Sequence, residues 1–580
     1  MRMTNRRVPL KVVRAYKMAA SMRMKRQACC LCRIPSLLTN ESAKFYLRTY
    51  SSKVKQTRHI KPGECCVDPD VAKPLTKGGS SFKTHPGIMT LRPVKMPEKL
   101  ITTIKKVIDT YPVQNLNKRS EKLNNYLHSR HPPTEQDTLT RLAQEIQDNI
   151  REKDKVDTST MTPEEQKQYE KKISLQVLKR LRYTQYHWVP LRFDAPTSMT
   201  YLYSRMAHNY SVMMRCFTEI SRREPEYIPN SMFDFGSGLA SSVWAGNRVW
   251  GQNIYEYYCV DSSQDMNTLA RLLLQGGEER KDMTISGVYF RQFMPSHKQN
   301  SFNIVTSSYT LLELPSEEKR LDTIRSLWQM TDDFLVLVEN GSKAGFQLIN
   351  EAKEYLLKIS EEQDKMEGHV FAPCPHEKAC PKLAERNSPC MFGVTYKPLN
   401  MSAQSTEAKQ TSRYSYVILR KGKRKQDAAW PRVIQEVVRA SKHVHCHLCW
   451  PDGKLSHDIL TAKKHGKDVY SCVRASNWGD LFPIHLKDST TSGDNRSQSG
   501  GVEVDNVDDE AGDEPEDYSD RTRKVDSGSS SEDRLQNVTL NKYNETFVSE
   551  VLTEKLESVG TDTTRRTTWR MPVRLFSSPT

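Results

Sequence analysis

The sequence has 580 residues, of which 37% are hydrophobic and 27% are charged, and its mean hydropathy is -0.69. That length suits two or three domains, but so polar a composition indicates that part of the chain does not fold. No run of eighteen apolar residues is present, which excludes a protein that crosses a membrane by helices. The net charge of +17 favours a polyanionic partner, with nucleic acid ahead of an anionic membrane surface.

The first fifty residues have the composition of a targeting segment. Residues 1–40 contain ten Lys or Arg and no acid, with small and apolar residues between the charges. Such a segment can form a basic amphipathic helix, as in a mitochondrial presequence, and it lacks the apolar core of a secretory signal. We therefore expect a presequence over residues 1–52 and a location in the mitochondrial matrix. A disordered basic arm or a nuclear signal is the alternative.

Two regions of different composition follow the presequence. Residues 53–95 are rich in Lys, Pro, Gly and Ser, which predicts an extended basic arm. Over residues 96–225 apolar residues recur every three to four positions, which predicts a helical N-terminal region. Thr134 and Thr162, each followed by acids, are expected helix starts. His208, on the last helix of this region, is expected to pack in the core.

Short apolar runs alternate with helical stretches over residues 226–365. This βαβ alternation predicts a doubly wound, parallel α/β sheet covered by helices on both faces, which is a Rossmann-like core. A cysteine-rich C-terminal module is expected over residues 366–487. Residues 488–580 begin with an acidic, Ser-rich stretch and are predicted to be a disordered tail. The expected strands carry the runs SMFDFGSG, YEYYCVDSS, FNIVTSSYT and DFLVLVENG.

A glycine turn follows the first expected strand, in the sequence Asp234-Phe-Gly236-Ser-Gly238. Glycine lets the backbone approach a ligand closely, and the helix that follows offers unpaired N–H groups. Asp261, at the end of the next strand, is placed to accept hydrogen bonds from ribose hydroxyls. Ser241 occupies the third glycine position of a dinucleotide fingerprint, which disfavours that cofactor. The short form of the turn resembles S-adenosylmethionine-binding methyltransferases; a tight turn without a ligand is the alternative.

The residues after the strand FNIVTSSYT give little support for methyl transfer. The sequence there has no Asn- or Asp-Pro-Pro-aromatic turn and no Pro-Cys nucleophile. Glu313 is a conceivable base, but local pairing suits it better. We therefore assign no catalytic residue, and cofactor binding is better supported than catalysis.

Cysteines cluster in two segments of the C-terminal module. Cys374, Cys380 and Cys390 are separated by five and nine residues, and Cys446 and Cys449 follow far downstream. Four thiolates can hold either a zinc ion or a [4Fe-4S] cluster. The spacing lacks paired C-x2-C knuckles, so the iron–sulfur cluster is favoured over zinc. Other possibilities are a histidine ligand, from His376 or His447, and thiols buried without a metal.

Basic segments surround these cysteines. The run RYSYVILRKGKRK over residues 413–425 alternates apolar and polar residues and then becomes basic, which predicts a strand ending in positive charge. Lys463, Lys464 and Lys467 form a second basic group. Such loops can grip RNA phosphates, and Trp450 or Trp478 can stack on a base, although core packing is the commoner role of tryptophan.

Five motifs together resemble the mitochondrial methyltransferase-like protein 17 family, assembly factors of the small ribosomal subunit. They are DFGSGLASSVWA, APCPHEKACP with Cys390 following, RYSYVILRKG, the segment Cys449–Gly453 and the segment Trp478–Asp480, and the match covers roughly residues 95–485. The resemblance implies a methyltransferase fold that can hold S-adenosylmethionine, with catalytic activity lost. It also implies a [4Fe-4S] site at Cys374, Cys380, Cys390 and Cys449.

The same resemblance implies binding to immature small-subunit rRNA, together with the proteins of that subunit. We expect a monomeric assembly factor without membrane insertion. Two alternatives remain at this point. One is an active methyltransferase of small-subunit rRNA, and the other is an RNA-binding protein stabilised by zinc.

Overall fold

The structure is a computed structural model that describes most of the chain between residues 57 and 487. The described ranges are 57–76, 82–156, 161–184, 188–295, 301–363, 366–384, 389–399, 408–424 and 429–487. The predicted presequence and the predicted acidic tail lie outside the described residues.

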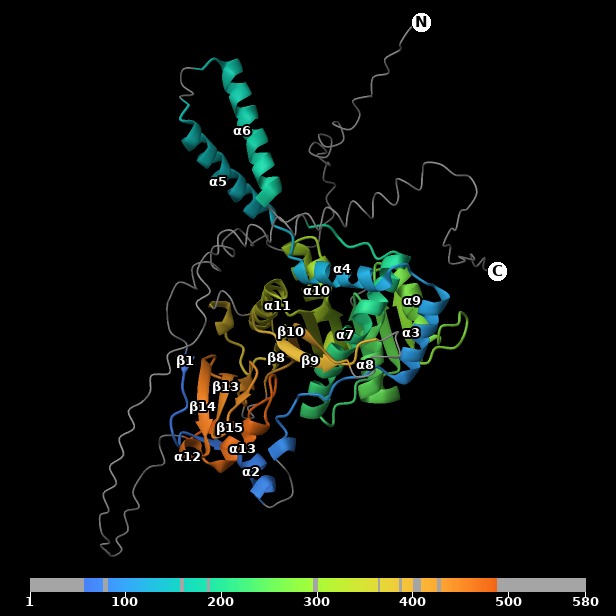
Figure 1. The fold of residues 1–580 in the computed structure, drawn as a ribbon, viewed down its shortest axis with the longest axis vertical. Helices are drawn as coiled ribbons and strands as arrows, with labels where there is room; N and C mark the ends of the chain where they lie inside the picture. The colour runs from blue at the N-terminus through green and yellow to red at the C-terminus, as the bar shows by residue number, and fades with distance from the viewer. Residues whose placement is uncertain are drawn as a thin grey trace, which may run out of the picture. The chain divides into compact units, whose positions relative to one another are not determined.

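An eight-stranded sheet forms the centre of the fold (Figure 1). Its strand order is β5-β4-β3-β6-β7-β10-β8, and β9 pairs with β10. Strands β3 to β7 are mutually parallel, whereas β10 runs antiparallel to β7, β8 and β9. The strands are β3 (Ser231–Phe235), β4 (Glu256–Val260), β5 (Val288–Arg291), β6 (Phe302–Ser308), β7 (Thr331–Asn340), β8 (Gly368–Ala372), β9 (Phe392–Tyr396) and β10 (Gln410–Lys421).

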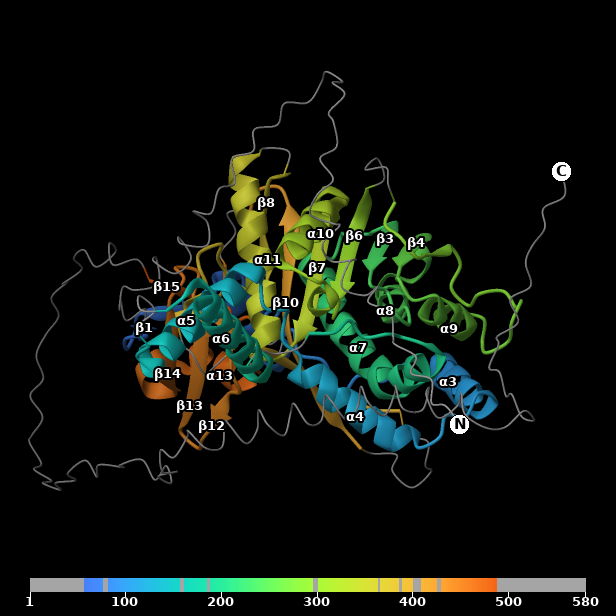
Figure 2. The same cartoon turned by 90° about the horizontal axis from the view of Figure 1, so that it is seen from above.

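Helices cover both faces of this sheet (Figure 2). The central strands are apolar and buried, as parallel strands covered on two sides require. Two hydrophobic cores result, one on each face. The first core includes residues of α3 (Glu98–Thr110), α7 (Ala195–Arg223), α8 (Ser241–Trp250) and α9 (Gln264–Leu274), and the second includes residues of α10 (Glu317–Gln329) and α11 (Lys343–Glu362). The predicted Rossmann-like α/β core is therefore confirmed for the parallel strands β3 to β7, but the whole sheet is mixed rather than parallel, because β10 pairs antiparallel with β7, β8 and β9.

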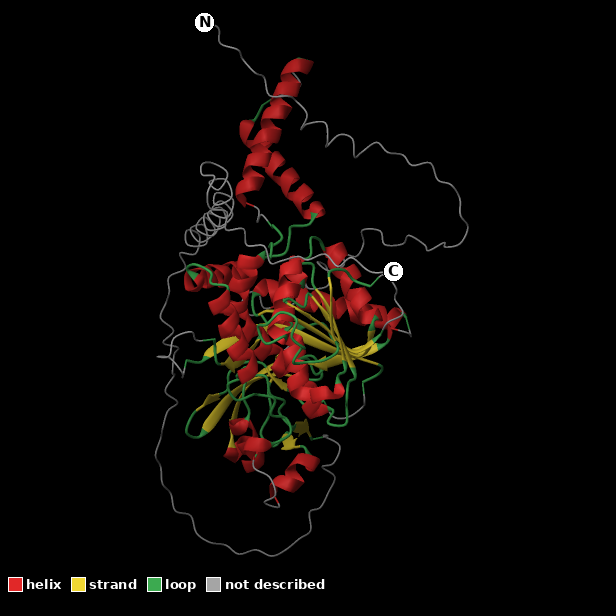
Figure 3. Cartoon of the chain, turned by 90° about the vertical axis from the view of Figure 1, so that its right-hand side faces the viewer, coloured by secondary structure: helices red, strands yellow, loops and turns green. Residues whose placement is uncertain are grey.

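The N-terminal region is helical, as its periodicity predicted (Figure 3). Besides α3 it contains α4 (Leu116–Ser129), α5 (Gln136–Asp154) and α6 (Pro163–Thr184). Thr162 starts α6 through a capping box, in which Glu165 accepts a 2.9 Å bond from the Thr162 backbone N–H. Ile150 and Ile173 bury the contact between α5 and α6. The long helix α7 begins at Asp194, whose carboxylate accepts from the backbone N–H of Thr197.

A second, smaller sheet forms what we call the small module, which consists of residues 57–76 and 429–487. In it β14 (Leu455–Thr461) lies between β1 (Thr57–Arg58) and β13 (His443–Cys449). The other elements are α2 (Pro69–Thr76), β11 (Arg432–Val433), β12 (Val438–Arg439), α12 (Ala462–His465), α13 (Lys467–Ala475), and β2 (Cys65–Val67), which pairs with β15 (Ile484–Leu486).

Two expected boundaries differ from the structure. Residues 58–67, expected in an extended arm, supply strands and core residues to the small module, because their few apolar side chains pack against β13 and α13. Residues 368–421, expected in the cysteine-rich module, instead complete the central sheet. The sequence pattern could not reveal these pairings, since both join segments far apart in the chain. Among the described residues, no helix has the length and apolar character needed to cross a membrane.

A buried ionic network joins the sheet to the small module. Glu219 on α7 accepts hydrogen bonds from Arg215 at 2.7 Å and from Arg432 of β11 at 2.6 Å. Arg432 also donates to the carbonyl oxygens of Pro373 and Gly479. Burial opposes the charge of Glu219, but the surrounding guanidinium groups outweigh it and hold the pKa of Glu219 far below its ordinary value. This carboxylate therefore stays ionised and fixes the module against the sheet.

Candidate functional site

A cavity of about 380 Å³ opens at the carboxyl ends of the parallel strands, and we call it the sheet-edge cavity. Ligands bind at this edge in open α/β sheets, because the loops after neighbouring strands diverge there. Its floor comes from the ends of β3, β4 and β6. Its walls include Phe193 and Tyr201, whose rings meet edge to face at 5.3 Å. The cavity is thus a mixed aromatic and polar site, suited to a ligand with a nucleoside part.

The glycine turn shapes the floor of the sheet-edge cavity. Gly236 has φ +69°, and a Cβ atom there would lie 2.1 Å from Oγ1 of Thr310. Gly238 also has a left-handed backbone, but a Cβ atom there would meet no atom closer than 4.0 Å. Gly236 is therefore required by the protein itself, whereas Gly238 leaves open space beside the cavity.

Asp261 faces the sheet-edge cavity with its carboxylate held in place. Its two oxygens accept from the backbone N–H groups of Gly238 at 2.9 Å and Ser263 at 2.8 Å. Burial raises the pKa of Asp261, and these two bonds oppose that rise. Each carboxylate oxygen has a second acceptor site, so Asp261 can also accept from ligand hydroxyls.

Asp234 occupies a different position from the other three predicted cofactor residues. Gly236, Gly238 and Asp261 line the sheet-edge cavity, but Asp234 does not. It is 1% exposed and accepts a 2.6 Å bond from the Thr306 hydroxyl. Burial raises the pKa of Asp234 to about 6. Asp234 therefore braces β3 against β6 beneath the glycine turn and does not face a ligand.

The rim of the sheet-edge cavity contains residues that the sequence analysis did not select. Arg205 on α7 donates to the Asn340 side chain at 3.1 Å and stacks over Tyr309. Tyr309 has φ +60°, and among the described residues its buried hydroxyl has no hydrogen-bond partner. Glu313 forms an ion pair, as expected, but with Arg130, which lies far away in the sequence. No sequence motif could have identified these residues, because neither the positive φ of Tyr309 nor the position of Arg205 on α7 leaves a recognisable pattern.

The four predicted cysteine ligands line one small cavity, which we call the cysteine cavity. Cys374 and Cys380 follow β8, Cys390 precedes β9, and Cys449 ends β13 of the small module. All four are free thiols. Burial raises the pKa of Cys449, and Cys374, Cys380 and Cys390 raise it further because their charges would repel. The structure therefore brings together sulfur atoms that are up to 75 residues apart in the sequence.

The structure distinguishes Cys449 from its neighbour Cys446. Cys446 is buried in the core of the small module and does not line the cysteine cavity. Burial raises its pKa, with Asp458 as the next cause and no cysteine among the causes. The side chains of these two residues leave β13 on opposite faces, as an odd spacing requires. Cys472, expected in the core, is also buried there.

The cysteine cavity has the donor set for a metal centre, but it is not arranged as one. Among the described residues, no group of three or more His, Cys, Asp or Glu side chains is positioned to hold a metal ion. His376 lies beside the thiols, with its Nε2 3.4 Å from Sγ of Cys449. Burial lowers the pKa of His376 to about 4, so the ring is neutral. His447 instead stacks on His457 at 4.2 Å on the module's outer face.

The fold and the glycine turn define a Rossmann-like α/β protein with a ligand cavity at the carboxyl edge of its sheet. Residues 195–483 match the family model described as mitochondrial small ribosomal subunit Rsm22. The human protein named "Ribosome assembly protein METTL17, mitochondrial" is 39% identical over 404 residues, which are 69% of this chain and 86% of that protein. The chain therefore belongs to the methyltransferase-like protein 17 family, as its motifs predicted.

Other similarities are more limited. The Rsm22-cox11 tandem protein 2 of Schizosaccharomyces pombe is 33% identical over 236 residues, covering 34% of this chain and 31% of that protein. A crystal structure of the plantazolicin methyltransferase BpumL covers 39% of this chain and 89% of its own, at 11% identity and a TM-score of 0.25. A precorrin-6y C5,15-methyltransferase from Geobacter metallireducens has 14% identity and a TM-score of 0.23, covering 37% of this chain and 88% of its own.

Proposed function

We propose that this protein is a mitochondrial matrix assembly factor that binds immature small-subunit rRNA. The single observation that carries the proposal is the 39% identity, over most of both chains, to a human protein named as a mitochondrial ribosome assembly protein. The basic sequence supports an RNA partner. In this proposal the protein works as a monomer that docks on the rRNA and the proteins around it.

The cysteine cavity supports a [4Fe-4S] cluster held by Cys374, Cys380, Cys390 and Cys449, with zinc as the alternative. Unmetallated thiols in this setting are held neutral, since burial raises the pKa of Cys380 to about 12. A metal centre would convert these neutral thiols to thiolates, because coordination deprotonates a thiol. When bound, the cluster would supply a covalent tie among three segments. Those segments join the central sheet to the small module.

The sheet-edge cavity supports S-adenosylmethionine as its ligand. The backbone at Gly238 leaves room for close approach, and Asp261 can accept from ribose hydroxyls. The buried Tyr309 hydroxyl, which lacks a partner among the described residues, offers a further donor. These groups bind and orient a nucleoside ligand.

Methyl transfer is not part of this proposal. Glu313, the nearest conceivable base, is paired with Arg130, and its other oxygen lies 3.5 Å from the Leu191 backbone nitrogen. An active rRNA methyltransferase is the second candidate, which the ligand cavity keeps open. Loss of a single rRNA methyl group in an Asp261→Asn strain with normal subunit assembly would favour that candidate.

The experiment that tests the proposal is co-sedimentation of the anaerobically purified protein with small ribosomal subunits. We expect the full chain to migrate with immature subunits and to protect a defined rRNA segment. A Cys374→Ser protein should lose iron and lose this association together. Normal association by an iron-free Cys374→Ser protein would contradict the proposed coupling, and no association by the unaltered chain would contradict the assembly role.

A further inference from the structure

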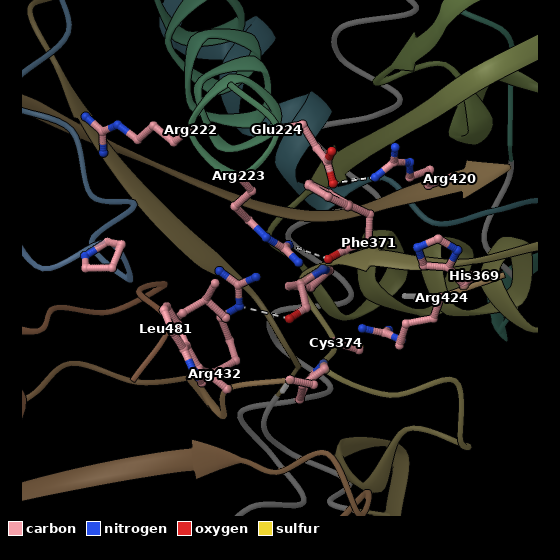
Figure 4. Close-up of a pocket in the computed structure, with 15 residues that line it drawn as sticks. Arg222, Arg223, Glu224, His369, Phe371, Cys374, Arg420, Arg424, Arg432 and Leu481 are labelled. Atoms are coloured by element: carbon pink, nitrogen blue, oxygen red, sulfur yellow. Dashed lines mark hydrogen bonds and ion pairs between the residues drawn. The ribbon is translucent and has the colours of Figure 1, made fainter. Parts of the chain in front are cut away.

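An arginine-rich pocket lies where the central sheet meets the small module, and we call it the arginine pocket. Its volume is about 340 Å³. Figure 4 shows that its basic side chains reach the same space from separate segments. These segments are the end of α7, the end of β10 with the residues after it, and β11. The basic lining residues are Arg222, Arg223, His369, Arg420, Arg424 and Arg432.

Some of these arginines have a structural role that explains them without a ligand. Arg432 is 1% exposed and is fully used by Glu219 and by two backbone carbonyls. Arg222 and Arg223 end α7, where positive charge stabilises the carboxyl end of a helix. Arg223 also stacks on Phe371, with its guanidinium carbon 3.8 Å from the ring centre. These contacts account for three arginines but not for the two that face them.

Arg420 and Arg424 approach from the opposite wall. Arg420 pairs with Glu224, and Arg424 donates to Glu377 from Nε and Nη2 at 2.9 and 2.7 Å. A guanidinium has five N–H donors in a plane. Arg424 also donates from Nη2 to the Val370 carbonyl oxygen at 2.5 Å, and in each arginine these contacts still engage only part of the fork.

The charge of the arginine pocket is not balanced within the described part of the chain. The five lining arginines and Arg215 beneath them carry six positive charges, against four described carboxylates that act on them, those of Glu219, Glu224, Glu377 and Asp480. Burial lowers the pKa of Arg223 to about 10, and repulsion from Arg432 and Arg424 contributes. Burial also lowers the pKa of His369, again with a contribution from Arg424. A bound anion would relieve this repulsion.

The remaining wall of the pocket is apolar and partly aromatic. Phe371, Trp430 and Pro86 contribute to it. The indole N–H of Trp430 donates to Asp68 at 3.0 Å, which holds the ring in place. Arginines that present a planar fork beside an aromatic wall suit a phosphate attached to a nucleoside better than a carboxylate on an aliphatic chain.

We propose that the arginine pocket is a phosphate-binding site that receives a backbone phosphate of the RNA bound by this protein. That the phosphate comes from RNA rests on the proposed function. That the site binds a phosphate rests on the lining of the pocket alone. Arg420 and Arg424 contact the phosphate oxygens together with the free edge of Arg223. Trp430 packs against the adjoining nucleoside.

The pocket also shares a segment with the cysteine cavity. Cys374 and Pro373 line both, and the Pro373 carbonyl accepts a bond from Arg432. A change in the ligation of Cys374 therefore changes the wall of the phosphate site. This contact gives a physical route by which a cluster could control RNA binding.

The test compares three variants of the full, anaerobically purified chain. The double variant Arg420→Gln/Arg424→Gln removes two charges from the pocket, and Arg222→Gln removes one that bonds only the Ile88 carbonyl. Arg248→Gln/Arg280→Gln removes two exposed charges that do not line the arginine pocket and is the matched control. Binding to a single-stranded RNA from the small subunit and binding of inorganic pyrophosphate are measured separately, with thermal unfolding as the check on folding.

We expect the double variant to weaken RNA binding about tenfold or more and to lower the salt-dependence slope by about one. Arg222→Gln should weaken binding less, and the control should match the unaltered chain. If the double variant lost pyrophosphate binding but bound RNA normally, the pocket would still be a phosphate site, but the proposal that RNA supplies the phosphate would be wrong. Unchanged binding of both probes by a folded double variant would overturn the proposal. If the unaltered chain bound pyrophosphate but no RNA, the proposed function would fail, and the pyrophosphate arm would still test the pocket.

Discussion

The sheet-edge cavity and the cysteine cavity are built in opposite ways. The floor of the first comes from strand–turn–helix units of the central sheet, in which Gly236 and Asp261 directly follow the neighbouring strands β3 and β4. The second gathers Cys374, Cys380 and Cys390 from loops beside the central sheet and Cys449 from the small module. The floor of the first cavity therefore belongs to the central sheet alone. The second exists only when the sheet and the small module are docked.

The difference has a consequence for stability. A site that spans two units contributes to holding them together, because whatever binds it stabilises the docked state. The sheet-edge cavity has no such role, since its floor belongs to a single sheet. Substitutions in the two regions should therefore affect stability and metal content differently.

The largest effect is expected from Cys449→Ala. Loss of one ligand should remove most of the bound iron, and with it a tie whose binding energy is on the order of 10 kcal/mol in small metal-held modules. The small module should then become sensitive to protease while the central sheet resists. Cys446→Ala is the matched control, because it removes a buried sulfur from the same strand but outside the cavity. Equal iron loss in both variants would mean that the assignment of Cys449 is wrong.

Glu219→Gln should lower the free energy of unfolding by about 3–5 kcal/mol, because it leaves buried guanidinium groups without their counter-charge. The measurement is urea unfolding followed by fluorescence. Glu224→Gln, at the pair with Arg420 whose side chains are 21% and 24% exposed, should cost less, about 1 kcal/mol. If the two variants behaved alike, the network would not be what joins the module to the sheet.

Gly236→Ala should destabilise the protein by roughly 2–4 kcal/mol, through both a left-handed backbone and overlap with Thr310. Gly251→Ala is a suitable control, since Gly251 also has positive φ but no atom within 4 Å of the added Cβ. Because Gly251 has φ +64° and ψ -135°, Gly251→Ala should lose about 1–3 kcal/mol through backbone strain alone. Thermal unfolding at one pH compares them, and iron content should stay unchanged in both. Iron loss in Gly236→Ala alone would show that the two cavities are coupled.

Glu339, buried at the end of β7, gives a pH dependence to the sheet. Burial raises its pKa to about 7, so the folded state keeps a proton that the unfolded state releases. Its contribution to stability should therefore fall as pH rises from about 4.5 to 7 and stay low above that. Glu339→Gln should remove this slope. Between pH 4.5 and pH 8, the unaltered chain should therefore lose about 2–3 kcal/mol more of its free energy of unfolding than the Glu339→Gln protein does. Parallel stability–pH curves for the two proteins would contradict this.

The sequence predicted features that depend on neighbours in the chain. Alternating strands and helices gave the central sheet, and the glycine turn with Asp261 located the sheet-edge cavity. What it missed depends on pairing across long distances. Residues 58–67 have too few apolar side chains to predict a strand, yet their partners in the small module order them. The cysteine ligand set came from the family resemblance, and Asp234 was misplaced because a strand-end carboxylate can point into either the sheet or the cavity.

The most direct test of the central claim is the metal content of the full chain purified without oxygen. Iron, acid-labile sulfide and zinc would be measured on the same sample, together with its absorption spectrum. We expect about four iron and four sulfide ions per chain, with a broad thiolate-to-iron absorption that disappears in Cys449→Ala. A folded chain that binds small-subunit RNA but holds neither iron nor zinc would contradict it.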